Sequence, residues 1–158
     1  MSNLITPFLW FDHQAEEAAK FYTSIFPNSK IGKIVRNNEA SPGPTGGVMT
    51  VQFTLDGKEF TALNGGPHFH FTEAVSFVVH CETQQEVDRY WEKLLAGGTP
   101  SQCGWLKDRY GLSWQIVPNA LLELLGSPDA QKAQHVTQAM MKMVKLDIEG
   151  LKKAAEQA

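Results

Sequence analysis

The chain has 158 residues, and its 14 lysines and arginines stand against 17 aspartates and glutamates, giving a formal net charge of −3. A slightly acidic protein does not suit nucleic-acid binding that relies on neutralising phosphates. The length is marginal for a dinucleotide-binding domain with a separate substrate domain, and four Trp and nine Phe exclude a disordered assembly factor. The sequence therefore predicts one globular domain or two small fused modules.

Targeting and redox signals are negative. The first residues, MSNLITPFLWFD, have no basic stretch before an apolar core, so we expect no secretory signal. No apolar run approaches the roughly 20 residues of a membrane helix. Cys81 and Cys103 form no C-x-x-C motif, and we expect Cys81 to be a small buried hydrophobe. These features predict a cytoplasmic protein that associates with no membrane.

The first half predicts a strand, a helix and three further strands. Residues 4–12 form a short apolar segment that predicts the first strand. The helical pattern after it begins at Glu16 and ends before Pro27. The three strands are expected at Lys30–Arg36, Val48–Leu55 and Lys58–Leu63. Asp56-Gly57 predicts a tight hairpin between the last two strands. The Pro/Gly-rich stretch NNEASPGPTGG is the best candidate for a mobile lid.

The second half repeats this order. We expect a strand at Val75–Cys81, a helix from Thr83 to Leu95 that ends at Gly97-Gly98, and short strands around Gln102–Lys107 and Leu112–Val117. A shift of 69 residues aligns the two helices. It places Glu17, Phe21, Tyr22, Ile25 and Phe26 on Glu86, Tyr90, Trp91, Leu94 and Leu95. The sequence therefore predicts two βαβββ modules.

The remainder predicts helices. Ser127-Pro128-Asp129 reads as an N-cap, a proline at the first helical position and an acid in the first turn. Asp147 is a candidate N-cap for a second helix. The apolar stripe that should face the core, or an oligomer interface, consists of Val136, Met140, Met143, Val144 and Leu151.

Long phrases of the chain closely resemble one protein family. FLWFDHQAEEAAKFY, ALNGGPHFHF, FVVHCETQQEVDRYWEKLLAGG, GWLKDRYGLSWQIVP and QAMMKMVKLDI are similar to the PhnB-like branch of the vicinal-oxygen-chelate (glyoxalase/bleomycin-resistance/dioxygenase) superfamily. This branch is often labelled 3-demethylubiquinone-9 3-methyltransferase. The resemblance implies an α+β fold in which two βαβββ modules form a cupped eight-stranded mixed sheet around a pocket, and a homodimer.

The expected domain is single and spans residues 1–158, with module one at about 4–66, module two at about 74–118 and C-terminal helices at about 119–157. Superfamily enzymes typically bind a divalent ion through inward side chains on the first, fourth, fifth and eighth strands. Strand alternation and the module shift place these positions at Pro7 (or its neighbour Thr6), Thr61, Ser76 and Gln115. Hydroxyls and one amide hold Zn²⁺ or Ni²⁺ poorly, so we expect no metal and no cofactor.

Histidines offer a second route to a metal. His68 and His70 lie on one side of an extended segment, and His80 should face the pocket. Because no third ligand lies near them in sequence, we favour a polar rim. The run Lys107-Asp108-Arg109 could clamp a ligand, although such runs are more often solvated turns.

The methyltransferase label finds no support in the motifs. Gly65-Gly66-Pro67 follows a fourth strand and Gly46-Gly47 precedes a strand, whereas a cofactor-binding turn follows a first parallel strand and opens a helix. Pro67 also removes a backbone amide that could have bound an anion.

We therefore expect a small organic ligand in a cupped pocket. Gln115 is the foremost candidate for a functional side chain, orienting the ligand by hydrogen bond. The expected walls are Thr61, Ser76, Val78, Gln115 and Val117, and the expected rim is Asn64, His68 and Trp105. Trp10, Trp91 and Trp114 are expected to pack beneath the helices. A metal-dependent isomerase, lyase or dioxygenase-type enzyme and the labelled methyl transfer are the alternatives.

Overall fold

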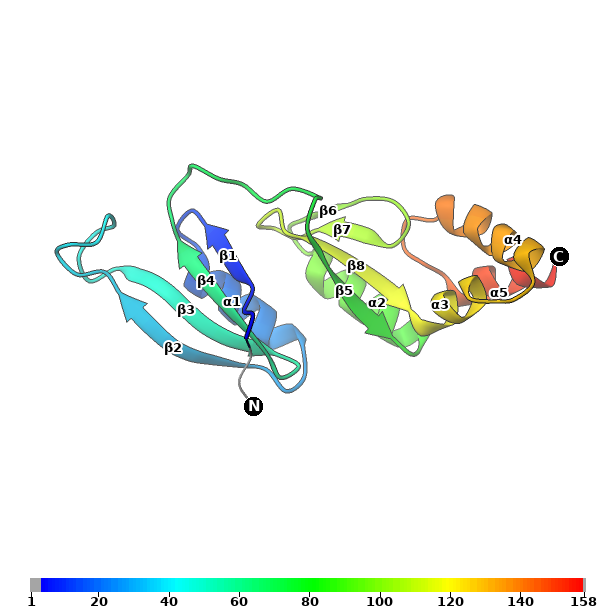
Figure 1. Ribbon diagram of the computed structural model, residues 1–158, viewed down its shortest axis with the longest axis horizontal. Coiled ribbons are helices and arrows are strands. Elements are labelled where there is room, and N and C mark those ends of the chain that lie inside the picture. Colours follow the sequence, from blue (N-terminus) through cyan, green and yellow to red (C-terminus); the bar gives the residue numbers. More distant parts are fainter. Residues whose placement is uncertain (1–3, 158) are drawn as a thin grey trace. The chain divides into compact units, whose positions relative to one another are not determined.

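The computed structural model describes residues 4–157 and divides into two compact units, the first ending at Phe71 and the second beginning at Thr72 (Figure 1). Each unit contains a four-stranded mixed sheet and a helix that follows its first strand. The predicted α+β class and the βαβββ order of both halves are confirmed. None of the helices in the described part of the chain is both long and apolar enough to span a membrane.

The first unit forms one sheet in the order β1-β4-β3-β2. Its elements are β1 (Phe8–Phe11), α1 (Ala15–Ile25), β2 (Lys30–Arg36), β3 (Val48–Leu55) and β4 (Lys58–Asn64). β1 runs parallel to β4, and the other neighbours are antiparallel. The hairpin between β3 and β4 turns at Asp56 and Gly57, whose φ angles of 50° and 77° are the positive values that this turn requires.

The loop between β2 and β3 closes on itself. The backbone N–H of Asn37 donates to the carbonyl of Gly47 at 2.8 Å, and the N–H of Gly46 donates to the carbonyl of Asn37 at 2.9 Å. The Asn37 side chain also donates to the carbonyl of Pro44. These hydrogen bonds hold the two ends of the loop together, so its tip is the part that extends away from the sheet.

The second unit repeats the same strand order as β5-β8-β7-β6. Its elements are β5 (Ser76–Cys81), α2 (Gln84–Leu95), β6 (Thr99–Pro100), β7 (Trp105–Lys107) and β8 (Ser113–Pro118). Thr83 caps α2 by accepting a hydrogen bond from the N–H of Glu86. β6, which has only two residues, was absent from the prediction because so short a pairing leaves no pattern of alternation.

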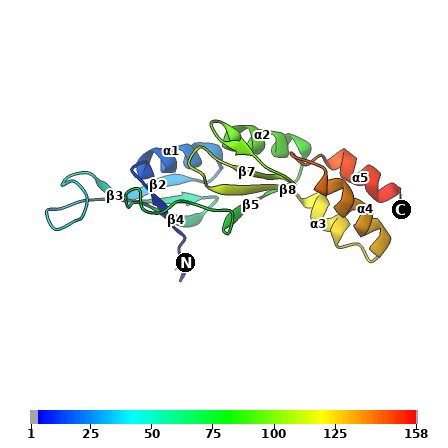
Figure 2. The same cartoon turned by 90° about the horizontal axis from the view of Figure 1, so that it is seen from above.

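Each sheet packs one face against its own helix (Figure 2). In the first unit Tyr22 of α1 lies over Phe53, whose ring stacks on that of Phe60. In the second unit Trp91 of α2 and Trp114 of β8 are buried, as predicted. Trp10 was predicted to pack beneath the helix, and this was wrong. Leu9 and Phe11 occupy the helix side of β1, so strand alternation turns Trp10 to the opposite face.

Three helices complete the second unit: α3 (Asn119–Leu125), α4 (Ala130–Met141) and α5 (Ile148–Glu156). Their shared core consists of Val117, Leu121, Val136, Leu146, Leu151 and Ala155, with Met140 and Met143 packed against it. Val144 does not join this stripe and is 42% exposed. The predicted N-cap Ser127 is also wrong: α4 starts two residues later, where the Asp129 carboxylate accepts from the N–H groups of Gln131 and Lys132.

The two units are related residue by residue. The 69-residue shift aligns buried positions of the two helices: Ala18 and Tyr22 of α1 correspond to Val87 and Trp91 of α2. The first strands follow a shift of 70, because Phe8 pairs with Thr61 where Val78 pairs with Gln115. The connection from strand to helix is one residue shorter in the second unit, which accounts for the difference.

Candidate ligand site on the second sheet

The central strand β8 of the second sheet separates two kinds of side chain. Trp114 and Ile116 are 3% and 0% exposed and pack on the side of α2. Ser113, Gln115 and Val117 point to the other face, as the alternation predicted. We call this the far face; the neighbouring strands add to it Ser76, Val78 and His80 from β5 and Trp105 and Lys107 from β7.

Gln115 is held in a defined orientation by Ser76. Its side-chain Nε2 donates a hydrogen bond to the Ser76 hydroxyl at 2.9 Å, so two residues predicted to share a site do meet. Because Ser76 Oγ accepts this bond, its own proton remains to be donated. Gln115 Oε1 accepts no hydrogen bond from the described residues. The pair therefore presents one acceptor and one donor to a ligand.

Apolar surfaces flank the Gln115 amide on both sides. In the register of the sheet Gln115 is the direct partner of Val78 on β5 and of Trp105 on β7. Val78 is 43% exposed and Trp105 is partly buried. Trp105, predicted at the rim, thus lies beside the predicted polar contact. An indole next to a fixed amide suits a flat molecule with a hydrogen-bonding group.

A second polar row crosses the far face two residues earlier along β8. Ser113 is the register partner of both Ser76 and Lys107. The Lys107 ammonium forms an ion pair with Glu73 at 2.7 Å. The hydrogen bond from Lys107, together with its positive charge, lowers the pKa of the Glu73 carboxyl. Ser113 and Glu73 were absent from the predicted site, although the position of Ser113 two residues before Gln115 already placed it on the same face.

Val117 and Asn64, both predicted to line the site, stabilise the fold instead. Val117, predicted as a wall, is buried in the core of the C-terminal helices. Asn64 lies at the helix side of the first sheet, where its Oδ1 accepts from the N–H of Ala15 at 2.8 Å and its Nδ2 donates to the carbonyl of Val48 at 3.0 Å. Asn64 thereby caps α1 across 49 residues of sequence, and both atoms of its amide are already engaged.

The remaining predicted residues, Thr61, Pro7 (or Thr6) and His68, lie outside the second sheet. Thr61 lies in β4, partly buried, and its N–H donates to the carbonyl of Pro7. Because Phe8 is the register partner of Thr61, Thr6 rather than Pro7 shares the side-chain parity of Thr61. His68 is exposed in the segment after β4.

The donor groups of the described residues bear on whether a divalent metal fits. Within residues 4–157 no three side chains among His, Cys, Asp and Glu come together in a way that could hold an ion. His68, His70 and His80 are all exposed. In the second unit the two predicted positions offer a hydroxyl and an amide that bind each other, a donor set with little affinity for transition metals. The residues present do not fit the superfamily's metal.

The centre of the run Lys107-Asp108-Arg109 is buried and structural, and is not a solvated turn. Asp108 is 3% exposed, and its Oδ1 accepts from the backbone N–H groups of Tyr110 and Leu112. Its Oδ2 accepts from the indole N–H of Trp114 at 2.9 Å. The carboxylate therefore fixes the turn between β7 and β8 and links it to the core.

The glycine pairs have structural duties as well. A Cβ atom on Gly65 would clash with the indole of Trp10, and the Trp10 Nε1 donates to the carbonyl of Gly66 at 2.9 Å. Phe69 packs edge-on against the same indole at 4.9 Å. Gly46 and Gly47 close the loop between β2 and β3. Neither pair opens a helix, so neither resembles a nucleotide-binding turn.

Cys81 lacks the surroundings of a nucleophile. It is fully buried, and this burial raises the pKa of its thiol to about 11, with Glu86 adding a smaller effect in the same direction. The thiolate is the reactive form, so Cys81 stays protonated and inert near neutral pH.

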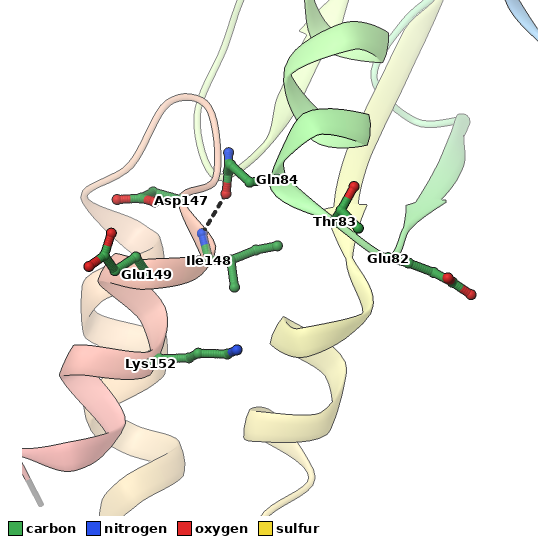
Figure 3. A pocket seen from close by; sticks show the side chains of 7 residues that line it. All are labelled: Glu82, Thr83, Gln84, Asp147, Ile148, Glu149 and Lys152. Atoms are coloured by element: carbon green, nitrogen blue, oxygen red, sulfur yellow. Dashed lines mark hydrogen bonds between the residues drawn. The ribbon is translucent and has the colours of Figure 1, made fainter.

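A separate surface cavity of about 440 Å³ lies where α2 and α5 begin (Figure 3). Its lining residues are Glu82, Thr83, Gln84, Asp147, Ile148, Glu149 and Lys152. The Gln84 side chain joins the two helices, since its Oε1 accepts from the N–H of Ile148 at 2.8 Å and its Nε2 donates to the carbonyl of Leu146. Lys152 extends into this space, whereas Glu82 and Glu149 point away from it. The cavity therefore lies where Gln84 links α2 to the start of α5.

Comparisons with known proteins agree with this architecture. A PhnB protein from Bacillus cereus is 41% identical, with a TM-score of 0.67 over 73% of this chain and 99% of that chain. A protein from Pseudomonas aeruginosa is 19% identical, with a TM-score of 0.61 over 74% and 98% of the respective chains. The fosfomycin resistance protein FosX from Listeria monocytogenes, complexed with Mn(II) and sulfate, is 16% identical, with a TM-score of 0.52 over 75% and 90%.

None of the curated proteins matches the chain. A family model described as 3-demethylubiquinone-9 3-methyltransferase matches residues 3–117, which include both βαβββ units up to Val117 in β8. The two repeated four-stranded sheets, the identity with the Bacillus cereus PhnB protein and this match lead to one conclusion: the chain belongs to the PhnB-like 3-demethylubiquinone-9 3-methyltransferase family.

Proposed function

We propose that this protein binds a small organic molecule on the far face of its second sheet, and that it does so without a divalent metal. The carrying observation is the 2.9 Å hydrogen bond that fixes Gln115 against Ser76, with Trp105 and Val78 on either side of the amide. Glutamine does not titrate and cannot act as a general base. Its role is to orient the ligand through Oε1.

The test uses 2-naphthamide as the probe, because its ring suits the Trp105 indole and its N–H group suits Gln115 Oε1. We expect isothermal calorimetry to detect binding, and the Gln115→Leu variant to bind about tenfold more weakly, which is the loss of one to two hydrogen bonds of about 1 kcal/mol each. Gln138→Leu on the exposed side of α4 is the matched control and should bind normally. Equal affinity of the two variants would contradict the proposal.

The metal-dependent alternative draws on FosX, which has been described with Mn(II). Protein purified without added metal is measured by elemental analysis. We expect no stoichiometric transition metal. A stoichiometric metal that is lost in Gln115→Ala would overturn the metal-free proposal in favour of an isomerase, lyase or dioxygenase-type enzyme.

Methyl transfer is the activity named in the family description. Both glycine pairs are engaged in the packing and loop closure described above, which favours ligand binding without adenosylmethionine. Calorimetry with millimolar adenosylmethionine should detect no heat of binding. Saturable binding would support the methyltransferase hypothesis instead.

The proposal retains two further expectations that follow from family membership: a homodimer, and a cupped eight-stranded sheet formed from both units. Analytical ultracentrifugation checks the first, with a monomer at all concentrations as the contrary result. A crystal structure checks the second.

A further inference from the structure

Three polar side chains form a line across the far face. Ser76 of β5, Ser113 of β8 and Lys107 of β7 are direct register partners on adjacent strands. Neighbouring strands of a sheet lie about 4.8 Å apart, which sets the spacing of paired residues on one face. Two hydroxyls and an ammonium therefore stand side by side, two residues along β8 from the row that holds Gln115 and Trp105.

The central hydroxyl of this line lacks a hydrogen-bond partner. Ser113 is 1% exposed, and its Oγ is buried without a hydrogen bond to any described group. Leaving a buried hydroxyl unpaired costs about 1–3 kcal/mol, and native proteins rarely keep such a group without a reason. A ligand atom that accepts a hydrogen bond from Ser113 would remove this cost.

The ammonium at the end of the line already holds a carboxylate. Glu73, three residues before β5, contacts Lys107 at 2.7 Å, and the two side chains are 62% and 44% exposed. Exposed ion pairs of this kind contribute little to stability because water screens them. The Glu73 carboxylate thus shows which chemistry Lys107 accepts, and another oxyanion can replace it at low cost.

From this geometry we propose that the ligand carries an oxyanion, a carboxylate or a phosphonate, which replaces Glu73 at Lys107 and accepts hydrogen bonds from Ser113 and Ser76. This inference rests on the proposed function, since it assigns the other end of the same ligand. Two residues along a strand span roughly 6.5 Å. The ligand therefore bears its anionic group about that far from the part of its flat body that lies against Trp105, beside Gln115.

The experiment compares three probes by calorimetry: 2-naphthoate, 2-naphthylphosphonate and the neutral 2-naphthamide. We expect at least one anion to bind about tenfold more tightly than the amide, and the preferred anion identifies the kind of oxyanion. Lys107→Gln should reduce anion affinity about tenfold, Ser113→Ala about fivefold, and Glu73→Gln should raise it severalfold because the competing carboxylate is gone.

Lys145→Gln is the matched control, because Lys145 forms a similar ion pair with Asp88 at 2.8 Å and is comparably exposed, at 42% against 44% for Lys107. It should leave anion affinity unchanged, and an equal loss in both lysine variants would overturn the inference. Naphthamide that binds as tightly as the anions, with a loss in Gln115→Leu, would overturn the oxyanion but retain the ligand site. No binding of any probe at millimolar concentration would overturn both.

Discussion

The two units share a strand order but differ in the chemistry of corresponding sheet faces. The row of β5, β8 and β7 that carries Val78, Gln115 and Trp105 corresponds to Phe8, Thr61 and Gln52 in the first unit. The second row, Ser76, Ser113 and Lys107, corresponds to Thr6, Glu59 and Thr54 by the same register. The fold therefore fixes where side chains lie, whereas the identity of each side chain decides what a position can bind.

The largest expected effect concerns the turns that join the last two strands of each sheet. The first unit uses Asp56-Gly57 with positive φ angles, while the second depends on the buried carboxylate of Asp108. Asp108→Ala leaves two backbone N–H groups and an indole N–H without their acceptor, so we expect a loss of about 3 kcal/mol in the free energy of unfolding by urea.

The matched pair is Asp108→Asn against Asp56→Asn. Asparagine at position 108 replaces one carboxylate oxygen by an N–H₂ group, whereas asparagine at position 56 tolerates the left-handed φ of 50°. We expect a clear loss in the first variant and almost none in the second. Similar losses in both would show that the two turns are stabilised in the same way.

A medium effect is expected where each unit begins its first helix. Asn64 caps α1 from the end of β4, whereas α2 is capped locally by Thr83. Asn64→Ala breaks two hydrogen bonds and should cost about 1–2 kcal/mol in urea unfolding, and Thr83→Ala about 1 kcal/mol. Asn64→Asp keeps an acceptor at the helix start and should fall between wild type and Asn64→Ala. A neutral Asn64→Ala would mean that the long-range cap does not stabilise the first unit.

The smallest effect on the folded protein concerns the cysteines. The pKa of Cys81 is raised to about 11, so it holds its proton in the folded state at pH values where the unfolded chain releases it. Stability from this group is therefore present below pH 9 and is lost as the pH rises from 9 to 11. Iodoacetamide labelling followed by mass spectrometry should modify the partly exposed Cys103 at pH 8 and leave Cys81 unmodified. Equal labelling of both would contradict the burial.

Much of the architecture was predictable because it depends on local periodicity. The alternation of polar and apolar residues in Ser113–Pro118 revealed both faces of β8, and Asp56-Gly57 indicated the hairpin directly. The side of the sheet on which Trp10 lies was wrongly predicted. Every residue of the four-residue strand FLWF is apolar, so the sequence does not indicate which side chains face the helix. Only the pairing of β1 with β4 fixes which residues face the helix.

The candidate site was predictable to the same extent. Gln115 and Ser76 followed from alternation, and they meet. The cap formed by Asn64 and the burial of Asp108 depend on groups brought together by the folded chain, so no short-range pattern announces them. The unpaired hydroxyl of Ser113 is likewise a property of packing.

The closed loop between β2 and β3 has a practical consequence. Its ends are joined by the hydrogen bonds between Asn37 and the Gly46-Gly47 pair, while its tip near residues 39–41 is largely exposed. An insertion at the tip leaves these bonds and the sheet ladder intact. A peptide tag or a spectroscopic label placed there would leave the sheet of the first unit intact, which makes this loop a suitable point of attachment for immobilised binding assays.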